Sequence, residues 1–387
     1  MQLADARPDT DFSDRVLRRL AAAAPRTVFS YPLRNGDCLL RPSPLLLHLP
    51  VGTVHHGPSQ APANLIRKSA GELETIEDIS GPPLAEAGEL SGGTTILKDQ
   101  ALCPFRAFAH HRLNARGLRD PGTGIDPSLR GILLHAVLEE FWGRTRSWEK
   151  LVSLAEGELD RLVAEAIETA LTPINRRTVR PLTAPLLEIE KERLCLLVRE
   201  WLTEVEAKRT PFTVMELERE HQENFGGVSF RTRVDRIDEL PDGDRLILDY
   251  TTGRFDLNDL LAERPLEPPL PFYGVGEGDG RLAGVGVAIL RRGECGLKGV
   301  ARKDDILPRT AAFDGSRPAE KHGLEGWPSL LERWRAGLES LGQEFARGEA
   351  AVAPVDLQKA CRYCDLGGFC RIDEASQPPR PEEGDEE

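Results

Sequence analysis

Four cysteines in two distant runs could bind a metal ion or a cluster. Cys361, Cys364 and Cys370 stand in the run Cys-Arg-Tyr-Cys-Asp-Leu-Gly-Gly-Phe-Cys, and Cys103 opens the run Cys-Pro-Phe-Arg. Four thiolates suit either zinc or an iron–sulfur cluster, and the spacing by itself leaves both open. The layout predicts a clamp that ties the region of Cys103 to the C-terminal part of the chain.

Two aspartates have the setting of a metal-binding hairpin. Asp235 ends an alternating segment at 228–235, as expected of a half-covered strand, and Asp249 lies in the segment 245–251 that follows a Pro-Asp-Gly-Asp turn. Because side chains repeat every second residue in a strand, Asp249 and Thr251 share one face. Carboxylates on adjacent strands could converge on Mg²⁺ or Mn²⁺, the ions that assist phosphodiester hydrolysis. Taken alone, such a pair also describes the solvated edge of a hairpin.

Three segments, read together, favour the metal site. The run Gly-Ile-Leu-Leu-His-Ala-Val-Leu-Glu holds His135 at the edge of a helical apolar stripe, Val-Asp-Arg-Ile-Asp holds Asp235, and Leu-Asp-Tyr-Thr-Thr-Gly holds Asp249. These runs resemble the G-x-x-x-H-x-x-L-E, V-D-R-I-D and D-Y-K-T-G motifs of PD-(D/E)XK nucleases of the RecB/AddB kind, closest to the AddB-like group of probable DNA repair proteins. The resemblance covers roughly residues 94–375. It implies that His135, Asp235 and Asp249 bind Mg²⁺ or Mn²⁺.

Two positions depart from the family's motifs. Thr251 stands where the family has its catalytic lysine, and a hydroxyl has neither the charge nor the reach of an ammonium group. Pro269 stands where the family's Q-L-P-L-Y segment has glutamine, although Tyr273 is retained. Strand alternation turns Arg236 away from the acids, and Arg254 follows the strand. Neither arginine is expected to replace the lysine.

The resemblance implies an activity, and two alternatives stand beside it. It implies a metal-dependent DNA nuclease of repair or recombination, acting on single-stranded DNA exposed by a helicase partner. Loss of a transition-state cation costs several kcal/mol, so the first alternative is a catalytically inactive pseudonuclease that binds DNA or the helicase. The second is a zinc-stapled interaction module without affinity for DNA.

The cysteines fit the same resemblance. Some relatives hold a [4Fe-4S] cluster with one cysteine ahead of the nuclease core and a C-x₂-C-x₅-C run after it. Cys103, Cys361, Cys364 and Cys370 occupy these positions, which implies a structural cluster, with zinc as the alternative.

The resemblance implies an α/β domain of the PD-(D/E)XK type, with a mixed sheet flanked by helices. Helices are predicted over about 98–115, 129–143, 147–171, 184–208 and 328–348, and strands over 228–235, 245–251, 282–290 and 296–302, with one or two more strands at 26–50. The expected parts are residues 1–56, which resemble the end of a helicase-like domain, a linker at 57–93, the nuclease-like domain at 94–376 and a disordered acidic tail at 377–387.

Composition bounds the partners and the location. The 387 residues carry a net charge of −13, and ten units of it come from residues 71–90 and 377–387. No window is apolar enough to span a bilayer and the N-terminus lacks a secretory signal, so we expect a cytoplasmic protein. No Walker-type phosphate loop is present, so no ATP motor is expected. A local stripe of arginines could follow a DNA backbone, although a solvated helix face has the same pattern: Arg106, Arg112, Arg116 and Arg119.

Overall fold

The computed structural model describes residues 7–52, 78–84, 92–117, 125–177, 183–276 and 280–372. The chain forms two compact units, Met1–Ile76 and Glu77–Glu387. The expected acidic tail lies outside the described residues, as do Arg119 and most of the expected linker.

The first unit contains one helix and a small hairpin. Helix α1 spans Arg7–Ala22 and was not predicted. Strands β1 (Arg34–Asn35) and β2 (Cys38–Leu39) pair antiparallel around Gly36, whose φ of 57° lies in the left-handed region that glycine adopts without strain. The 3₁₀ turn η1 follows at Pro44–Leu46.

The second unit is built on a five-stranded mixed sheet in the order β3-β4-β5-β6-β7. The antiparallel hairpins β3–β4 and β4–β5 are followed by a parallel β5–β6 pair and an antiparallel β6–β7 pair. The predicted mixed sheet flanked by helices is therefore confirmed. The strands are β3 (Thr213–Phe225), β4 (Val228–Glu239), β5 (Arg245–Thr251), β6 (Leu282–Ile289) and β7 (Gly296–Ala301).

Strand β3 is an element that the sequence analysis missed. Its sequence, Thr-Val-Met-Glu-Leu-Glu-Arg-Glu-His-Gln-Glu-Asn-Phe, is rich in residues with low strand propensity, and only Val214 and Phe225 are buried. Its pairing with β4 along most of its length makes it a strand. A Gly226-Gly227 turn joins the two strands, and a Cβ at Gly226 would meet the backbone nitrogen of Gln343 in α12 at 2.1 Å, so glycine is required where the helix approaches the turn.

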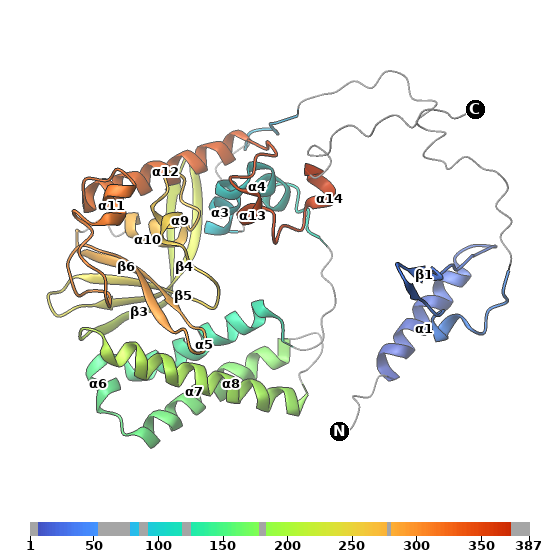
Figure 1. Cartoon of the computed structure of the whole chain (residues 1–387), viewed down its shortest axis with the longest axis horizontal. Coiled ribbons are helices and arrows are strands. Elements are labelled where there is room, and N and C mark those ends of the chain that lie inside the picture. The colour runs from blue at the N-terminus through green and yellow to red at the C-terminus, as the bar shows by residue number, and fades with distance from the viewer. Residues whose placement is uncertain are drawn as a thin grey trace. The chain divides into compact units, whose positions relative to one another are not determined.

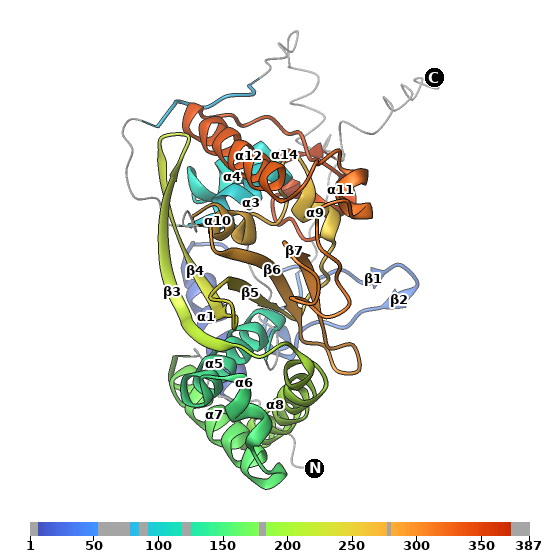
Figure 2. The ribbon, with the colours of Figure 1, turned by 90° about the vertical axis from the view of Figure 1, so that its left-hand side faces the viewer.

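Helices cover both faces of the sheet (Figures 1 and 2). On one face α3 (Thr94–Leu102), α10 (Pro269–Gly276) and α12 (Trp327–Arg347) share a core around the buried Trp334. On the other face α5 (Pro127–Thr145), α7 (Glu156–Arg177) and α8 (Ala184–Glu204) share a core around the buried Trp201. The shorter elements are α4 (Pro104–His111), α6 (Trp148–Ser153), η2 (Glu206–Lys208), α9 (Leu257–Leu261), α11 (Arg317–Lys321), α13 (Leu357–Ala360) and α14 (Gly367–Cys370).

Two predicted helices are each divided in the structure. The helix predicted over 98–115 divides into α3 and α4 at Cys103, which is extended with φ −166° because the following Pro104 disfavours helical backbone before it. The helix predicted over 147–171 divides into α6 and α7. There Ser153 Oγ donates to Lys150 O at 2.8 Å and satisfies a carbonyl at the end of α6.

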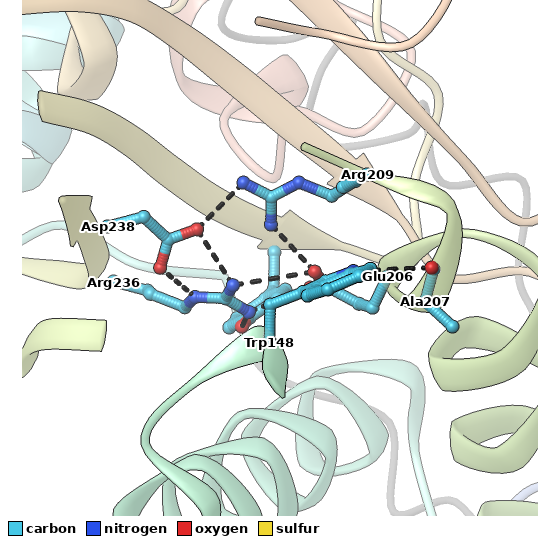
Figure 3. A network of polar contacts seen from close by, with 7 residues as sticks. Trp148, Glu206, Ala207, Arg209, Arg236 and Asp238 are labelled. Carbon is cyan, nitrogen blue, oxygen red and sulfur yellow. Dashed lines mark hydrogen bonds and ion pairs between the residues drawn. The ribbon is translucent and has the colours of Figure 1, made fainter. Parts of the chain in front are cut away.

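A buried ion-pair network ties β4 to the segment after α8 (Figure 3). Arg236 Nε lies 2.6 Å from Asp238 Oδ1, and Arg236 Nη1 lies 2.7 Å from Glu206 Oε1. Arg209 completes the network, with Nη2 2.8 Å from Asp238 Oδ2 and Nη1 2.6 Å from Glu206 Oε2. Two guanidinium groups and two carboxylates balance in charge, as burial of ions requires. Arg236 is therefore committed to the interior of the protein.

Candidate metal centre

His135, Asp235 and Glu218 bring three possible metal ligands together. One ligand atom of each lies within 4.8 Å of the others. His135 Nδ1 is 3.3 Å from Asp235 Oδ1 and 3.9 Å from Glu218 Oε1. The other ring nitrogen, Nε2, lies 3.0 Å from the backbone carbonyl of Tyr250 and can only donate to it. That hydrogen bond fixes the tautomer and leaves the Nδ1 lone pair for a metal ion.

Asp249 adjoins this group from the neighbouring strand. Because Arg236 pairs with Leu248 in the antiparallel register of β4 and β5, Asp235 and Asp249 fall opposite each other. Burial and the charge of Asp235 raise the pKa of Asp249 well above its usual range. The second oxygen of Asp235 accepts the backbone N–H of Tyr250 at 2.7 Å, which holds that carboxylate in place. The two predicted acids therefore lie side by side, as expected of a hairpin.

Glu218 joins this group from β3, and neither the residue nor the strand was predicted. Its neighbours pair as Leu217 with Arg236 and Arg219 with Val234, so Glu218 stands opposite Asp235. Its φ of 49° lies in the left-handed region, which is uncommon for a residue with a side chain and frequent at functional sites. The alternation of Glu, Leu, Glu, Arg and Glu before the Val-Asp-Arg-Ile-Asp strand was the available signal.

The charges of the centre shift its proton affinities. Burial opposes a charge on His135, but hydrogen bonding and attraction to Asp235, with the charges of Asp249 and Glu218, outweigh burial and raise its pKa to about 9. Burial and repulsion by Asp235 raise the pKa of Glu218 to about 7. An excess of carboxylates over cations is what a divalent cation would neutralise.

Thr251 provides no cation, and its hydroxyl is already used. Thr251 Oγ1 accepts the backbone N–H of Gly253 at 3.0 Å, which shapes the turn after β5. Arg254 is exposed beyond that turn, and Arg236 is held in the buried network. The nearby sequence therefore offers no substitute for an ammonium group at this position.

A lysine reaches this region from another element. Lys98 Nζ in α3 lies 2.9 Å and 2.8 Å from the two carboxylate oxygens of Glu267. The charge of Glu267 is among those that raise the pKa of Asp249, after burial and Asp235. Helix α3 packs on the sheet, where Thr94 Oγ1 lies 3.1 Å from Thr232 Oγ1 of β4. The Lys98–Glu267 pair thus lies within the electrostatic range of Asp249.

Pro269 and Tyr273 both lie in α10. Pro269 is the first residue of that helix, where a missing N–H costs nothing. The Tyr273 hydroxyl lies 3.0 Å from Thr232 Oγ1, and burial raises its pKa above the usual range. Tyr273 is 2% exposed, so its hydroxyl forms a buried contact that joins α10 to β4.

The four cysteines of the predicted clamp line one pocket. Cys103 separates α3 from α4, Cys361 follows α13, and Cys370 ends α14. Among the described residues, no three cysteine sulfurs lie within 4.8 Å of one another. A zinc tetrahedron with Zn–S bonds of about 2.3 Å would bring its sulfurs within about 4 Å. The donor set suits a thiolate-bound group, whereas the spacing is wider than a zinc tetrahedron.

A polar network joins α3 and α4 to the cysteine-bearing segment. Asp99 is 2% exposed, and its Oδ1 lies 2.7 Å from Arg106 Nε. His110 bridges Asp99 and Asp365, with Nδ1 3.1 Å from the first carboxylate and Nε2 2.8 Å from the second. His111 Nε2 lies 2.9 Å from Asp99 Oδ2. The arginine of the Cys-Pro-Phe-Arg run thus stabilises the region around the pocket from inside the protein.

Carboxylates on adjacent strands beside a helix-borne histidine define a centre of the kind found in metal-dependent hydrolases. The chain belongs to the PD-(D/E)XK nuclease superfamily, whose model matches residues 94–371. Nucleases of this superfamily typically use divalent metal ions, and membership implies a nuclease-like function on DNA. No curated protein matches the chain. Among the described residues, no helix is both long and apolar enough to cross a membrane.

Proposed function

We propose that this protein is a divalent-metal-dependent DNA nuclease. The observation that carries the proposal is the convergence of His135, Glu218 and Asp235, with Asp249 on the adjacent strand. Asp235, Asp249 and Nδ1 of His135 would hold Mg²⁺ or Mn²⁺. When bound, such an ion supplies Lewis-acid stabilisation of the phosphoryl oxygens and lowers the pKa of a water molecule.

The protein's own residues can position and deprotonate the attacking water. Glu218 lies in the same group as His135 and Asp235, so its carboxylate can take a proton from a water molecule at the site. The Tyr250 N–H holds one oxygen of Asp235, and the Tyr250 carbonyl orients His135. Two groups of the centre are thus oriented by backbone atoms of one β5 residue.

Lys98 is the residue that we propose in the role of the missing lysine. An ammonium group on α3, tethered by Glu267 within range of Asp249, can offset charge that develops on the phosphate. Asp249 and Thr251 share one face of β5, so a cation from the α3 side would reach the face on which the family carries its lysine.

A pseudonuclease is the second candidate, and Thr251 and Pro269 favour it. Such a protein would keep the acids and His135 for binding a metal ion, and would hold DNA or a helicase partner without turnover. Strand β5 lacks the four-carbon stem and the charge of a lysine at Thr251. The choice between an active nuclease and a pseudonuclease therefore depends on whether Lys98 replaces that lysine.

The proposal extends to the nuclease subgroup, the group bound by the cysteines and the cellular role of the protein. The motifs around His135, Asp235 and Asp249 support a RecB/AddB-like nuclease of DNA repair or recombination, acting in the cytoplasm on single-stranded DNA supplied by a helicase. The common pocket of the four cysteines supports a structural [4Fe-4S] cluster. In this proposal residues 94–376 are the nuclease domain and residues 1–56 the remnant of a helicase-like domain.

Mn²⁺-dependent cleavage of end-labelled single-stranded DNA by anaerobically purified protein tests the proposal. Asp249→Ala is the blank, and Thr251→Lys is measured in parallel. Cleavage by the native chain above the blank supports the nuclease. If the native chain does not cleave DNA and Thr251→Lys does, the protein is a pseudonuclease, because its metal site is intact and lacks only the cation.

A further inference from the structure

A pocket lined by four arginines lies beside the metal centre. Arg130 of α5, Arg193 of α8, and Arg291 and Arg292 after β6 line a space of about 310 Å³ that also touches Thr252. Three elements far apart in the sequence thus direct guanidinium groups to one place. Like charges gathered in this way repel one another unless anions offset them.

The carboxylates of the protein offset only part of this charge. Glu190 is 1% exposed, and Arg193 Nε lies 3.0 Å from both of its oxygens. Arg130 Nε lies 3.7 Å from the same carboxylate, and Arg291 pairs at 3.1 Å with Glu294. Within the described part of the chain, Arg292 has no ion pair or hydrogen bond. Four guanidinium groups against two carboxylates leave two positive charges for an anion from outside.

The buried Glu190 also pre-organises the pocket for binding. Arg193 donates to this carboxylate through Nε and Nη2, so its side chain is already oriented and loses less conformational entropy on binding an anion. Planar guanidinium groups bind phosphate through paired N–H donors, which a flexible lysine does not reproduce. Phosphate is therefore the anion chemistry that best matches the pocket.

The pocket adjoins the metal centre through two connections. Arg130 precedes His135 by five residues on α5, a rise of about 7.5 Å along the helix axis. Leu290 N donates to Thr251 O at 2.8 Å, which joins the segment of Arg291 and Arg292 to the end of the strand that carries Asp249. Phosphates follow one another along a B-form strand at roughly 3.4 Å of axial rise, so an offset of this size lets the pocket and the centre hold two phosphates of one strand.

We propose that the arginine pocket binds a phosphate of the nucleic-acid strand a short distance along the strand from the phosphate that lies at the metal centre. The inference rests on the proposed function and adds the contact that sets the register of the strand. The phosphate is either an internal one or the one at the end of the strand. Both have the same recognition chemistry, and the probes below separate them.

The test measures binding without cleavage. Fluorescence anisotropy in EDTA compares the native chain with Arg291→Glu/Arg292→Glu, and Arg161→Glu/Arg347→Glu, at exposed arginines of α7 and α12, is the control with the same change in charge. Both pocket side chains lie at the surface or partly so, and circular dichroism of each variant checks folding. The double variant is expected to lose at least tenfold in affinity for a single-stranded 20-mer, with a shallower salt dependence, and the control less than threefold.

Three probes identify the phosphate: a circular single strand, a linear strand with a 5′ phosphate and one with a 5′ hydroxyl. Equal losses on all three assign an internal phosphate, and a loss confined to the 5′-phosphorylated strand assigns the terminal one. Unchanged affinity in the double variant, or no binding by the native chain, would overturn the pocket. If the native chain cleaves DNA and the double variant binds DNA normally, the proposed nuclease function stands and the pocket proposal fails. If the native chain does not cleave DNA and the double variant loses affinity, the pocket proposal stands and the nuclease function fails.

Discussion

His135 Nδ1 lies 3.3 Å from Asp235 Oδ1, while the opposite nitrogen of the ring donates to the Tyr250 carbonyl at 3.0 Å. A helix and two adjacent strands thus meet at one imidazole. The hydrogen bond to the Tyr250 carbonyl orients the ring so that Nδ1 faces the acids, and the negative charges of the acids raise the proton affinity of Nδ1. A metal ion that binds at this centre must therefore displace the proton on Nδ1.

Metal binding is expected to release protons and to strengthen with pH. The pKa of His135 is raised to about 9 and that of Glu218 to about 7, so below these values a metal ion must displace their protons. Calorimetry with Mn²⁺ between pH 6 and pH 9, in two buffers of different ionisation enthalpy, measures the released protons. Affinity that is flat over this range would contradict His135 as a ligand and Glu218 as a neighbour of the metal ion.

The same shifts predict that the metal-free protein loses stability as the pH rises. Both folded pKa values exceed the ordinary ones, so the native state binds protons more tightly than the unfolded state does. The contribution of His135 is complete below its ordinary pKa of about 6.5 and is lost as the pH passes about 9. Denaturant unfolding in EDTA checks this, with His135→Gln expected to flatten the profile.

Glu218→Gln is expected to weaken Mn²⁺ binding by about 10–100-fold and to lower cleavage in proportion, because the centre loses a carboxylate. The matched control is Glu220→Gln, two residues along β3, where the side chain is 59% exposed and lies outside the ligand group. Equal effects of the two substitutions would show that Glu218 matters only as part of the strand.

Lys98→Met is expected to lower Mn²⁺-dependent cleavage by at least 100-fold while single-stranded DNA affinity changes little, because the proposed contact strengthens in the transition state. Lys303→Met is the control, since Lys303 forms surface ion pairs with Asp242 and Asp244. Restoration of cleavage in Lys98→Met by Thr251→Lys would show that the two positions serve one function. Full activity of Lys98→Met would exclude Lys98 from the reaction.

Arg236→Met is expected to destabilise the fold by about 3–5 kcal/mol, because Glu206 and Asp238 would keep buried charge with only Arg209 as a partner. Urea denaturation measures the loss. Arg347→Met at the exposed end of α12 should stay within about 0.5 kcal/mol. A small loss in Arg236→Met would mean that the network relaxes or admits water.

Cys361→Ser is expected to lower soluble yield and to bleach the brown colour of anaerobically purified protein, because a cluster would lose one of its thiolates. Cys38→Ser, at an exposed cysteine in the first unit, should leave both unchanged. Analysis of iron and zinc in the native protein accompanies the colour. Zinc without iron would replace the cluster with a zinc site, and unchanged yield and colour in Cys361→Ser would exclude the clamp.

The sequence by itself determined the elements that carry the predicted ligands. Alternation in 228–235 and the apolar stripe around His135 each have a clear period, and the apolar run before Asp249 is typical of a buried strand. Pairing of Asp235 with Asp249 follows from a short hairpin, a local feature. These local signals were sufficient for the hairpin and for the family motifs, and the motifs in turn implied the mixed sheet.

Only the tertiary structure decided which distant residues join them. Glu218 lies on a strand of mostly charged residues that has no apolar period of its own and is defined by hydrogen bonds to β4. The Lys98–Glu267 pair joins residues 169 apart, and the arginine pocket joins α5, α8 and the end of β6. Contacts of this kind arise when helices pack on a sheet, and their sequence separation leaves no periodic signal to read.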